Sequence, residues 1–213
     1  MSLSPLFLAF LLASLVLAAT PGPGVVYVVT RTLAQGRRAG MASVAGVALG
    51  NLGNAVGAAL GLAALFAVSA LAFEVVRYAG AAYLVWLGWR TLRAPSAPAP
   101  GGAAPIPATP PARILRDGAL VSLLNPKTTL FFAAFLPQFI EPGGSKVVQS
   151  VGLGAVFVTI AACTDLLYVL GAGLVAPGLA RRPQGLPIGR WLSAAIYVAL
   201  GLYTAAMGER PRR

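Results

Sequence analysis

The chain has 213 residues, of which 58% are hydrophobic and only 10% are charged. A soluble globule of this size needs more polar side chains on its surface, so the composition indicates an integral membrane protein. The net charge of +11 would suit nucleic-acid binding, but the arginines fall in short stretches between apolar runs and form no continuous basic face. Nucleic acid is therefore not an expected partner. With no histidine and one cysteine, Cys163, we expect no metal site, cofactor or internal disulfide.

Six apolar segments predict six transmembrane helices, because each is about long enough to cross a bilayer. They are residues 4–30, 42–68, 75–92, 119–139, 147–176 and 191–207. Residues 94–112 are rich in proline, alanine and glycine and predict a flexible linker. The predicted fold is an all-α integral membrane protein with one three-helix half in residues 1–93 and another in residues 113–213.

The distribution of lysine and arginine predicts the orientation of these helices, because cytoplasmic loops carry an excess of both. The basic residues near one set of loops are Arg31, Arg37, Arg38, Arg90, Arg93, Arg113, Arg116, Arg181, Arg182 and Arg190. The alternate loops hold only Arg77 and Lys146, while the tail residues Arg210, Arg212 and Arg213 run against the trend. The linker is thus predicted in the cytoplasm and both termini outside. Each half has an odd number of helices, so the second enters the membrane in the opposite sense, as an inverted repeat.

Two of the predicted helices are interrupted by proline. Residues 20–24 (Thr-Pro-Gly-Pro-Gly) break the first and residues 125–127 (Asn-Pro-Lys) break the fourth. Proline inside a helix costs about 3 kcal/mol, and lysine in mid-membrane costs about 2.5 to 3.5 kcal/mol. Interrupted helices in corresponding positions of two halves indicate the binding site of a secondary transporter. The candidate substrate-binding residues are Thr20, Pro21, Gly22, Pro23, Gly24, Asn51, Asn54, Asn125, Pro126 and Lys127.

The second break suggests how a substrate would be held. A helix that restarts at Pro126 presents unpaired N–H groups and the positive end of its dipole, which attract a carboxylate, and Lys127 would favour the same anion. Residues 21–24 do the same for the first helix, where the glycines let the backbone approach a small ligand. Alternatively, Pro126 only kinks the helix and Lys127 reaches a membrane interface. Asn51 and Asn54 lie on one side of the second helix, where they can line a polar cavity or hydrogen-bond between helices.

Asp165 is the only acid that we place deep inside a predicted helix. A carboxyl group there can carry protons across the membrane, so Asp165 is the candidate for proton coupling. The competing interpretation is a static ion pair with Lys127.

Glycines recur at helical spacing in the second predicted helix and let another helix approach closely. They are Gly46, Gly50, Gly53, Gly57 and Gly61. This face is expected to pack within the monomer or to form the seam of a homodimer.

These residues favour an exporter of carboxylate-bearing small molecules, with protons and the lipid bilayer as its other partners. A cation or metal exporter would need several acidic or soft ligands, and the chain offers essentially Asp165. A membrane-embedded enzyme would need a nucleophile with a base or a pair of acids. Without histidine or a second buried carboxylate, the sequence predicts neither.

The chain resembles the LysE/RhtB family of bacterial amino-acid exporters over nearly its whole length. The resemblance is carried by residues 20–23 (Thr-Pro-Gly-Pro), residues 80–84 (Gly-Ala-Ala-Tyr-Leu) with Gly88, Gly118, residues 125–127, and residues 136–139 (Leu-Pro-Gln-Phe). It implies a six-helix exporter in the inner membrane that carries amino acids or related small metabolites, uses the proton motive force and works as an oligomer. The linker is longer and more repetitive than the resemblance leads us to expect.

Overall fold

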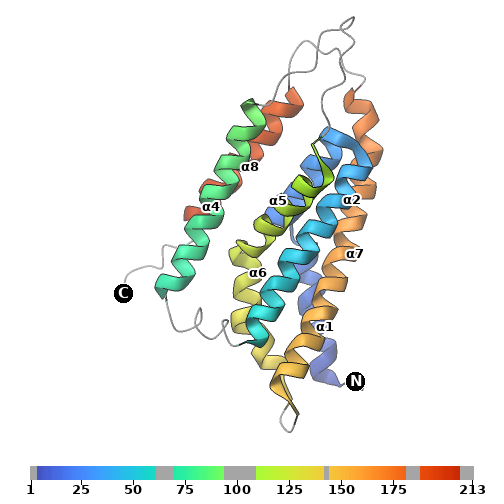
Figure 1. Ribbon diagram of the computed structural model, residues 1–213. Coiled ribbons are helices and arrows are strands. Elements are labelled where there is room, and N and C mark those ends of the chain that lie inside the picture. The colour runs from blue at the N-terminus through green and yellow to red at the C-terminus, as the bar shows by residue number, and fades with distance from the viewer. Residues whose placement is uncertain (1–3, 61–69, 94–108, 142–143, 181–187, 207–213) are drawn as a thin grey trace, which may run out of the picture.

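The computed structural model describes residues 4–60, 70–93, 109–141, 144–180 and 188–206, and within these ranges the chain is helical with no strand. The α-helices are α1 (Pro5–Ala19), α2 (Pro23–Ala59), α4 (Ala70–Arg93), α5 (Pro111–Leu123), α6 (Pro126–Leu130), α7 (Lys146–Ala180) and α8 (Ile188–Ala206). A π-helical turn (Phe131–Phe135) and a 3-10 turn (Leu136–Phe139) follow α6. The helices run along one long axis (Figure 1), so the all-α fold class is confirmed.

Two stretches of the described chain, α2 and residues 146–176 of α7, are long and apolar enough to cross a membrane by length and composition. Shorter apolar helices cover residues 5–19 and 194–206. Large apolar side chains such as Leu12, Leu167, Leu174 and Leu202 are more than half exposed. An apolar exterior of this kind matches the hydrocarbon of a bilayer.

Helix α2 reverses direction at Gly36. The backbone of Gly36 has φ 80° and ψ 179°, a conformation open in practice only to glycine. The arms before and after this residue lie side by side, because a methyl group on Gly40 would meet Thr32 and one on Gly24 would lie 3.3 Å from Val47. The turn therefore separates the first two predicted helices, and it falls among the arginines that follow the first of them.

Both predicted breaks are present. The chain leaves α1 after Ala19 and re-enters a helix at Pro23, and it leaves α5 after Leu123 and re-enters at Pro126. In each case proline occupies the first helical position, where its missing N–H removes no hydrogen bond. Beyond the second break the α-helix lasts to Leu130, and the π-helical and 3-10 turns continue the helical backbone to Phe139, where the fourth predicted helix ends.

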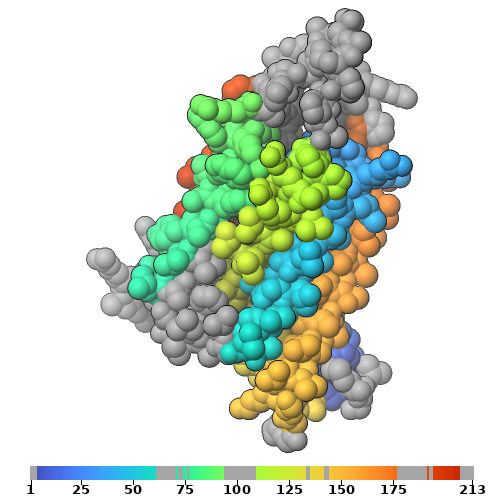
Figure 2. All heavy atoms as spheres, in the orientation of Figure 1, coloured from blue at the N-terminus to red at the C-terminus, as the bar shows by residue number. Residues whose placement is uncertain are grey.

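The glycines of α2 serve packing inside the molecule. A methyl group on Gly46 or Gly50 would collide with the carbonyl oxygens of Leu115 and Ala119 on α5. Figure 2 shows α5 lying between α4 and α2. Of the two expectations for this glycine face, packing within the monomer is therefore correct for Gly46 and Gly50. Gly61 lies outside the described residues.

A second pair of helices, α4 and α8, packs together along its length. Gly88 on α4 approaches the carbonyl oxygen of Ala194, and Gly201 on α8 approaches that of Ala81. Gly80 abuts the carbonyl oxygen of Leu124, next to the second break. The glycines that carry the family resemblance at residues 80 and 88 are thus contact points between helices.

Some predicted boundaries differ from the structure. Helix α4 begins at Ala70, five residues before the predicted start, so Arg77 lies inside a helix and is 4% exposed. Helix α5 begins at Pro111, within the last residues of the predicted linker. Residues 94–108 of the linker, Arg181 and Arg182, and the basic tail lie outside the described residues.

Candidate functional site

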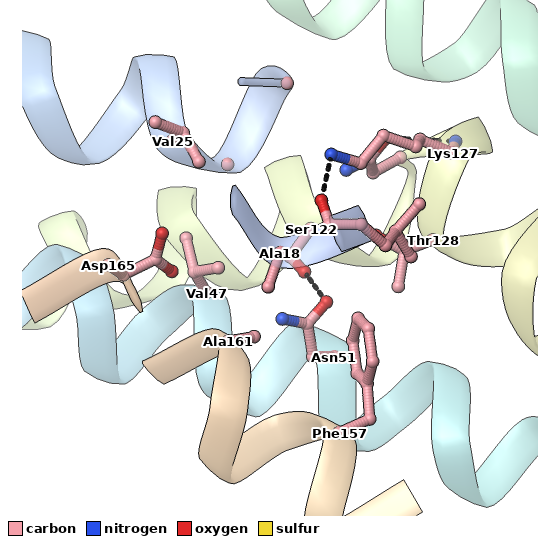
Figure 3. Close-up of a pocket in the computed structure, with 14 residues that line it drawn as sticks. Ala18, Val25, Val47, Asn51, Ser122, Lys127, Thr128, Phe157, Ala161 and Asp165 are labelled. Atoms are coloured by element: carbon pink, nitrogen blue, oxygen red, sulfur yellow. Dashed lines mark hydrogen bonds between the residues drawn. The ribbon is translucent and has the colours of Figure 1, made fainter. Parts of the chain in front are cut away.

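A cavity lies where the two breaks meet α7, near the middle of that helix. Among the candidate residues, those that line it are Gly22, Gly24, Asn51, Asn125, Lys127 and Asp165. Figure 3 shows Asp165 and Lys127 entering from different elements, with Asn51 and Phe157 on a third side. The volume open to the centre of a water molecule is about 40 Å³, room for a few waters. A larger ligand therefore needs the surrounding helices to move apart.

Lys127 ties the second break to the first. Its Nζ donates hydrogen bonds to the carbonyl oxygens of Leu17 (2.8 Å) and Thr20 (2.5 Å), at the end of α1 where the helix dipole is negative. A methyl group on Gly22 would lie 3.3 Å from the same nitrogen, so the break and the amine are in close contact there. The amine has three N–H donors, and these two bonds leave one toward the cavity. The static ion pair with Asp165 that the sequence left open is not formed, because the amine is held by these two carbonyl groups instead.

The two restarted helices differ at their amino ends. Asn125 accepts a hydrogen bond from the backbone N–H of Lys127 (3.1 Å), so the helix at Pro126 is capped by its own side chain. Gly22 makes no side-chain cap at the start of α2. The first backbone bond there runs from Val26 N–H to the Gly22 carbonyl (2.9 Å), which leaves the N–H groups of Gly24 and Val25 without intrahelical partners.

The free helix end therefore lies at the first break. The sequence predicted carboxylate-attracting helix ends at both breaks, and the Asn125 cap makes the end at Pro126 the weaker of the two. Gly24 and Val25 both line the cavity, so the positive end of α2 faces it.

Asp165, Ala161 and Phe157 follow one another at four-residue intervals on one face of α7. All three line the cavity. The residue is 4% exposed. Within the described part of the chain no group donates a hydrogen bond to its carboxylate. The neighbouring turn is fixed by Tyr168, whose hydroxyl donates to the carbonyl oxygen of Ala19 (2.9 Å). A buried carboxylate without a donor is unfavourable, so this one is suited to a cationic or protonating partner.

Asn51 and Asn54 differ in the two roles that the sequence left open, which are to line the cavity and to hydrogen-bond between helices. The Ser122 hydroxyl donates to Oδ1 of Asn51 (2.7 Å), while Nδ2 of Asn54 donates to the Ser122 carbonyl (3.0 Å). Asn51 lines the cavity as well, and Asn54 does not. Both asparagines thus bond between α2 and α5, and only Asn51 also faces the cavity.

The remaining candidates lie around the cavity without lining it. Thr20 and Pro21 are exposed, Pro23 is buried at the first position of α2, and Pro126 starts α6. Sequence reasoning missed lining residues that follow simple helical spacing. Ser122 lies one turn before the Asn125 break, and Phe157 and Ala161 lie two turns and one turn before Asp165.

Asp117 is a second buried carboxylate, so the prediction that the chain holds only one is wrong. It is 0% exposed and pairs with Arg90, Arg31 (3.6 Å) and Arg116 (3.5 Å), and it accepts a hydrogen bond from the Tyr83 hydroxyl (3.2 Å). We call these five residues the Asp117 cluster. The predicted fourth helix began at residue 119, so Asp117 fell just outside it and was not among the candidates. The arginines that precede it were the signal for a paired, buried acid.

Tyr27 packs against the Asp117 cluster through Arg31. It is 0% exposed, donates a hydrogen bond to the carbonyl oxygen of Ile114 (2.7 Å), and lies beneath the guanidinium of Arg31 (5.4 Å to the ring centre). One turn further along α2, Thr30 is hydrogen-bonded to the hydroxyl of Tyr197 on α8 (2.5 Å). Helices α2, α4, α5 and α8 are thus joined on the side of the cavity that leads to the linker.

Phenylalanine rings close the opposite side. Phe157 stacks on Phe131 (4.9 Å between ring centres) and meets Phe132 edge-on (5.1 Å). Phe10 of α1 contacts Phe131 (6.1 Å) and Phe139 (5.3 Å). We call Phe10, Phe131, Phe132, Phe139 and Phe157 the phenylalanine cluster. Because Phe157 also lines the cavity, this cluster forms its apolar end.

A family model described as LysE type translocator matches residues 15–208. An uncharacterized membrane protein of Vibrio cholerae serotype O1 is 35% identical over 82% of each chain. A homoserine/homoserine lactone efflux protein of Salmonella typhimurium is 34% identical over 83% of each chain. A leucine efflux protein of Klebsiella pneumoniae is 29% identical over 94% of this chain and 95% of its own. No solved structure matches the chain.

Proposed function

Because the chain belongs to the LysE type translocator family, we propose that it is a secondary transporter that exports amino acids, or closely related carboxylate-bearing metabolites, across the bacterial inner membrane. The observation that carries this proposal is the cavity between the two broken helices, which holds a cation, Lys127, and an unpaired acid, Asp165. Relatives named for homoserine and leucine efflux support the substrate class. We further propose that the proton motive force drives export through Asp165.

The substrate carboxylate is held at the first break. The free N–H groups of Gly24 and Val25 and the third N–H of Lys127 all lie at the cavity. A helix amino end and a nearby ammonium group both favour an anion. The apolar lining from Leu17, Val47 and Phe157 gives the substrate side chain a surface to pack against, which suits an aliphatic amino acid such as leucine.

The membrane topology that we propose rests on the two breaks and on the distribution of the basic residues. The first helix combines α1 with the arm of α2 before Gly36, and the second is the arm after it. The third is α4, the fourth combines α5, α6 and the turns up to Phe139, and α7 and α8 complete two inverted three-helix halves. In support, the broken first and fourth helices occupy corresponding positions and contribute to one cavity. The linker is then cytoplasmic and both termini are outside.

Alternating access is supported by the two clusters that border the region of the cavity. The Asp117 cluster and Tyr27 lie toward the linker, and the phenylalanine cluster lies toward the other side. With room for only a few waters, the cavity must widen to take up an amino acid. Export requires the linker side to open for loading and the phenylalanine side to open for release.

Uptake of labelled leucine and homoserine into inverted membrane vesicles tests the proposal. In such vesicles the cytoplasmic face is outside, so an exporter accumulates its substrate inside. We expect accumulation when the interior is acidic and its loss when the pH gradient is collapsed. Asp165→Asn should abolish gradient-driven accumulation and retain some exchange of substrate. Equal uptake with and without the gradient would reject proton coupling, and no uptake of either amino acid by the folded protein would reject amino-acid export.

A further inference from the structure

Asp165 is a buried acid whose carboxylate has no hydrogen-bond donor. The residue is 4% exposed and faces the cavity, and no described residue donates a hydrogen bond to it. Buried charges in proteins are ordinarily paired or neutralised. The site is thus incomplete without a partner that supplies either a proton or a positive charge.

The charged groups around Asp165 do not supply that partner. Lys127 on α6 is the described charge whose field reaches it, but the Lys127 amine is held by Leu17 and Thr20. On α2, Arg31 is engaged with Asp117. Arg37 packs at Gly173, eight residues along α7 and therefore about 12 Å away.

Elsewhere around the cavity, N–H donors lack an acceptor, just as Asp165 lacks a donor. The N–H groups of Gly24 and Val25 and the remaining N–H of Lys127 are donors that lack an anion. Asn125 adds a side-chain amide whose oxygen is already used by the backbone of Lys127. A ligand that carries both a carboxylate and an ammonium group would satisfy both sets of groups, and an α-amino acid carries the two on its α-carbon.

We infer that Asp165 binds the α-ammonium group of the substrate, and that the substrate and the driving proton occupy this one carboxylate in turn. This inference rests on the proposed function and adds the requirement for a free α-amine. When the amino acid binds, the proton of the Asp165 carboxyl group leaves to water, and the carboxylate pairs with the substrate ammonium. When the amino acid departs, a proton from the opposite side takes its place. Exchange then needs no second coupling site.

The inference is tested with purified protein and two ligands that differ in one group. Leucine is compared with its 2-hydroxy analogue, and homoserine with the analogue in which a hydroxyl replaces the α-amine. A charge-assisted hydrogen bond contributes enough for about a ten- to hundredfold preference for the amine. We also expect binding of the amino acid, measured in weak buffer below the pH at which Asp165 is fully ionised, to release a proton, and binding of the hydroxy analogue to release none.

Two variants separate ligand recognition from folding. Asp165→Asn keeps the size and hydrogen-bonding capacity but not the charge, so the preference for the amine should fall to within about threefold and proton release should vanish. Asp165→Glu keeps the carboxylate and should retain proton release. A wild-type protein that binds the amine and the hydroxy analogue equally would overturn the inference and leave amino-acid export standing. Failure of transport in vesicles would instead overturn the proposed function.

Discussion

The two clusters that border the region of the cavity differ in their chemistry. Toward the linker, the Asp117 cluster joins one fully buried carboxylate to three arginines and a tyrosine hydroxyl. At the other end the phenylalanine cluster makes only ring contacts. In a medium of low dielectric, charge pairs are strong and leave costly unpaired groups when they separate. Ring contacts lose their dispersion energy gradually.

This difference indicates how each end opens. The linker end is held by a few directional bonds from four helices, so its opening requires that Arg31 and Arg90 find new partners together. The phenylalanine end can open by small shifts of α1 and the irregular turns after α6, where the π-helical and 3-10 geometry already interrupts the regular hydrogen bonding. We expect the first end to behave as a switch and the second as a flexible seal.

The largest effect on stability is expected from Asp117→Ala. The side chains of Arg31 and Arg90 are only 15% and 27% exposed, and removal of their shared partner leaves buried charge uncompensated. The expected loss is about 3 to 5 kcal/mol, measured by thermal unfolding in detergent. Arg116→Ala is the matched control, because that side chain is 64% exposed and should cost less than about 1 kcal/mol. Equal losses for the two variants would show that the cluster is not a buried charge network.

Phe132→Ala should destabilise the phenylalanine end by a smaller amount. Truncation of a buried phenylalanine costs about 3 to 5 kcal/mol in water-soluble cores, but part of that is transfer from water, which membrane helices lack. We expect about 2 to 3 kcal/mol from lost contacts with Phe131 and Phe157. Phe135 is 49% exposed, so Phe135→Ala provides the control with little change. A loss as large as that of Asp117→Ala would contradict the contrast between the two ends.

Gly36→Ala tests whether the turn of α2, which lies between its two arms, requires glycine. Alanine at φ 80° has a strained backbone, so the variant should lose about 1 to 2 kcal/mol of stability. The loss is at the low end for such strain because a methyl group at Gly36 would meet no neighbour. Gly171→Ala is the control of opposite sign. Gly171 lies in α7, also with open space around its Cβ position, and alanine favours the helix by up to about 1 kcal/mol. If both variants stabilised the protein, the backbone at Gly36 would not require glycine.

Much of the fold was predictable because its determinants are local. Proline at residues 23 and 126 fixes where two helices restart, and this appears directly in the sequence. The cavity was located by the same residues, since Gly22, Gly24, Asn51, Asn125, Lys127 and Asp165 all line it. What remained hidden depends on long-range packing. The sequence does not show that Lys127 reaches the carbonyl oxygens of α1, which come 107 and 110 residues earlier.

The Asp117 cluster illustrates the same limit. Arg31, Arg90 and Asp117 are far apart in the sequence and belong to three helices, so no spacing rule connects them. Hydropathy places an acid that follows an arginine at the edge of a membrane helix, where it is expected to face water. The contact of Gly118 with Tyr27 and with the backbone of Ser43 and Val47 brings this edge into the interior, and Asp117 is buried with it.

The most direct test of the contrast between the two ends is the rate at which a thiol reagent labels a cysteine in the cavity. Cys163 is exposed and must first be replaced by serine, after which Ala161→Cys places a single thiol at a lining position that is 7% exposed.

Asp117→Asn keeps the shape of the side chain but weakens the linker end. Weakening by about 1.4 kcal/mol raises the open population about tenfold, so a membrane-impermeant thiol reagent should react about tenfold faster from the linker side. Phe132→Ala should accelerate the reaction from the opposite side only. Inverted and right-side-out vesicles distinguish the two directions and test the cytoplasmic placement of the linker. If both variants accelerate labelling from one side, the cavity has a single entrance, and the two clusters do not act as opposite gates.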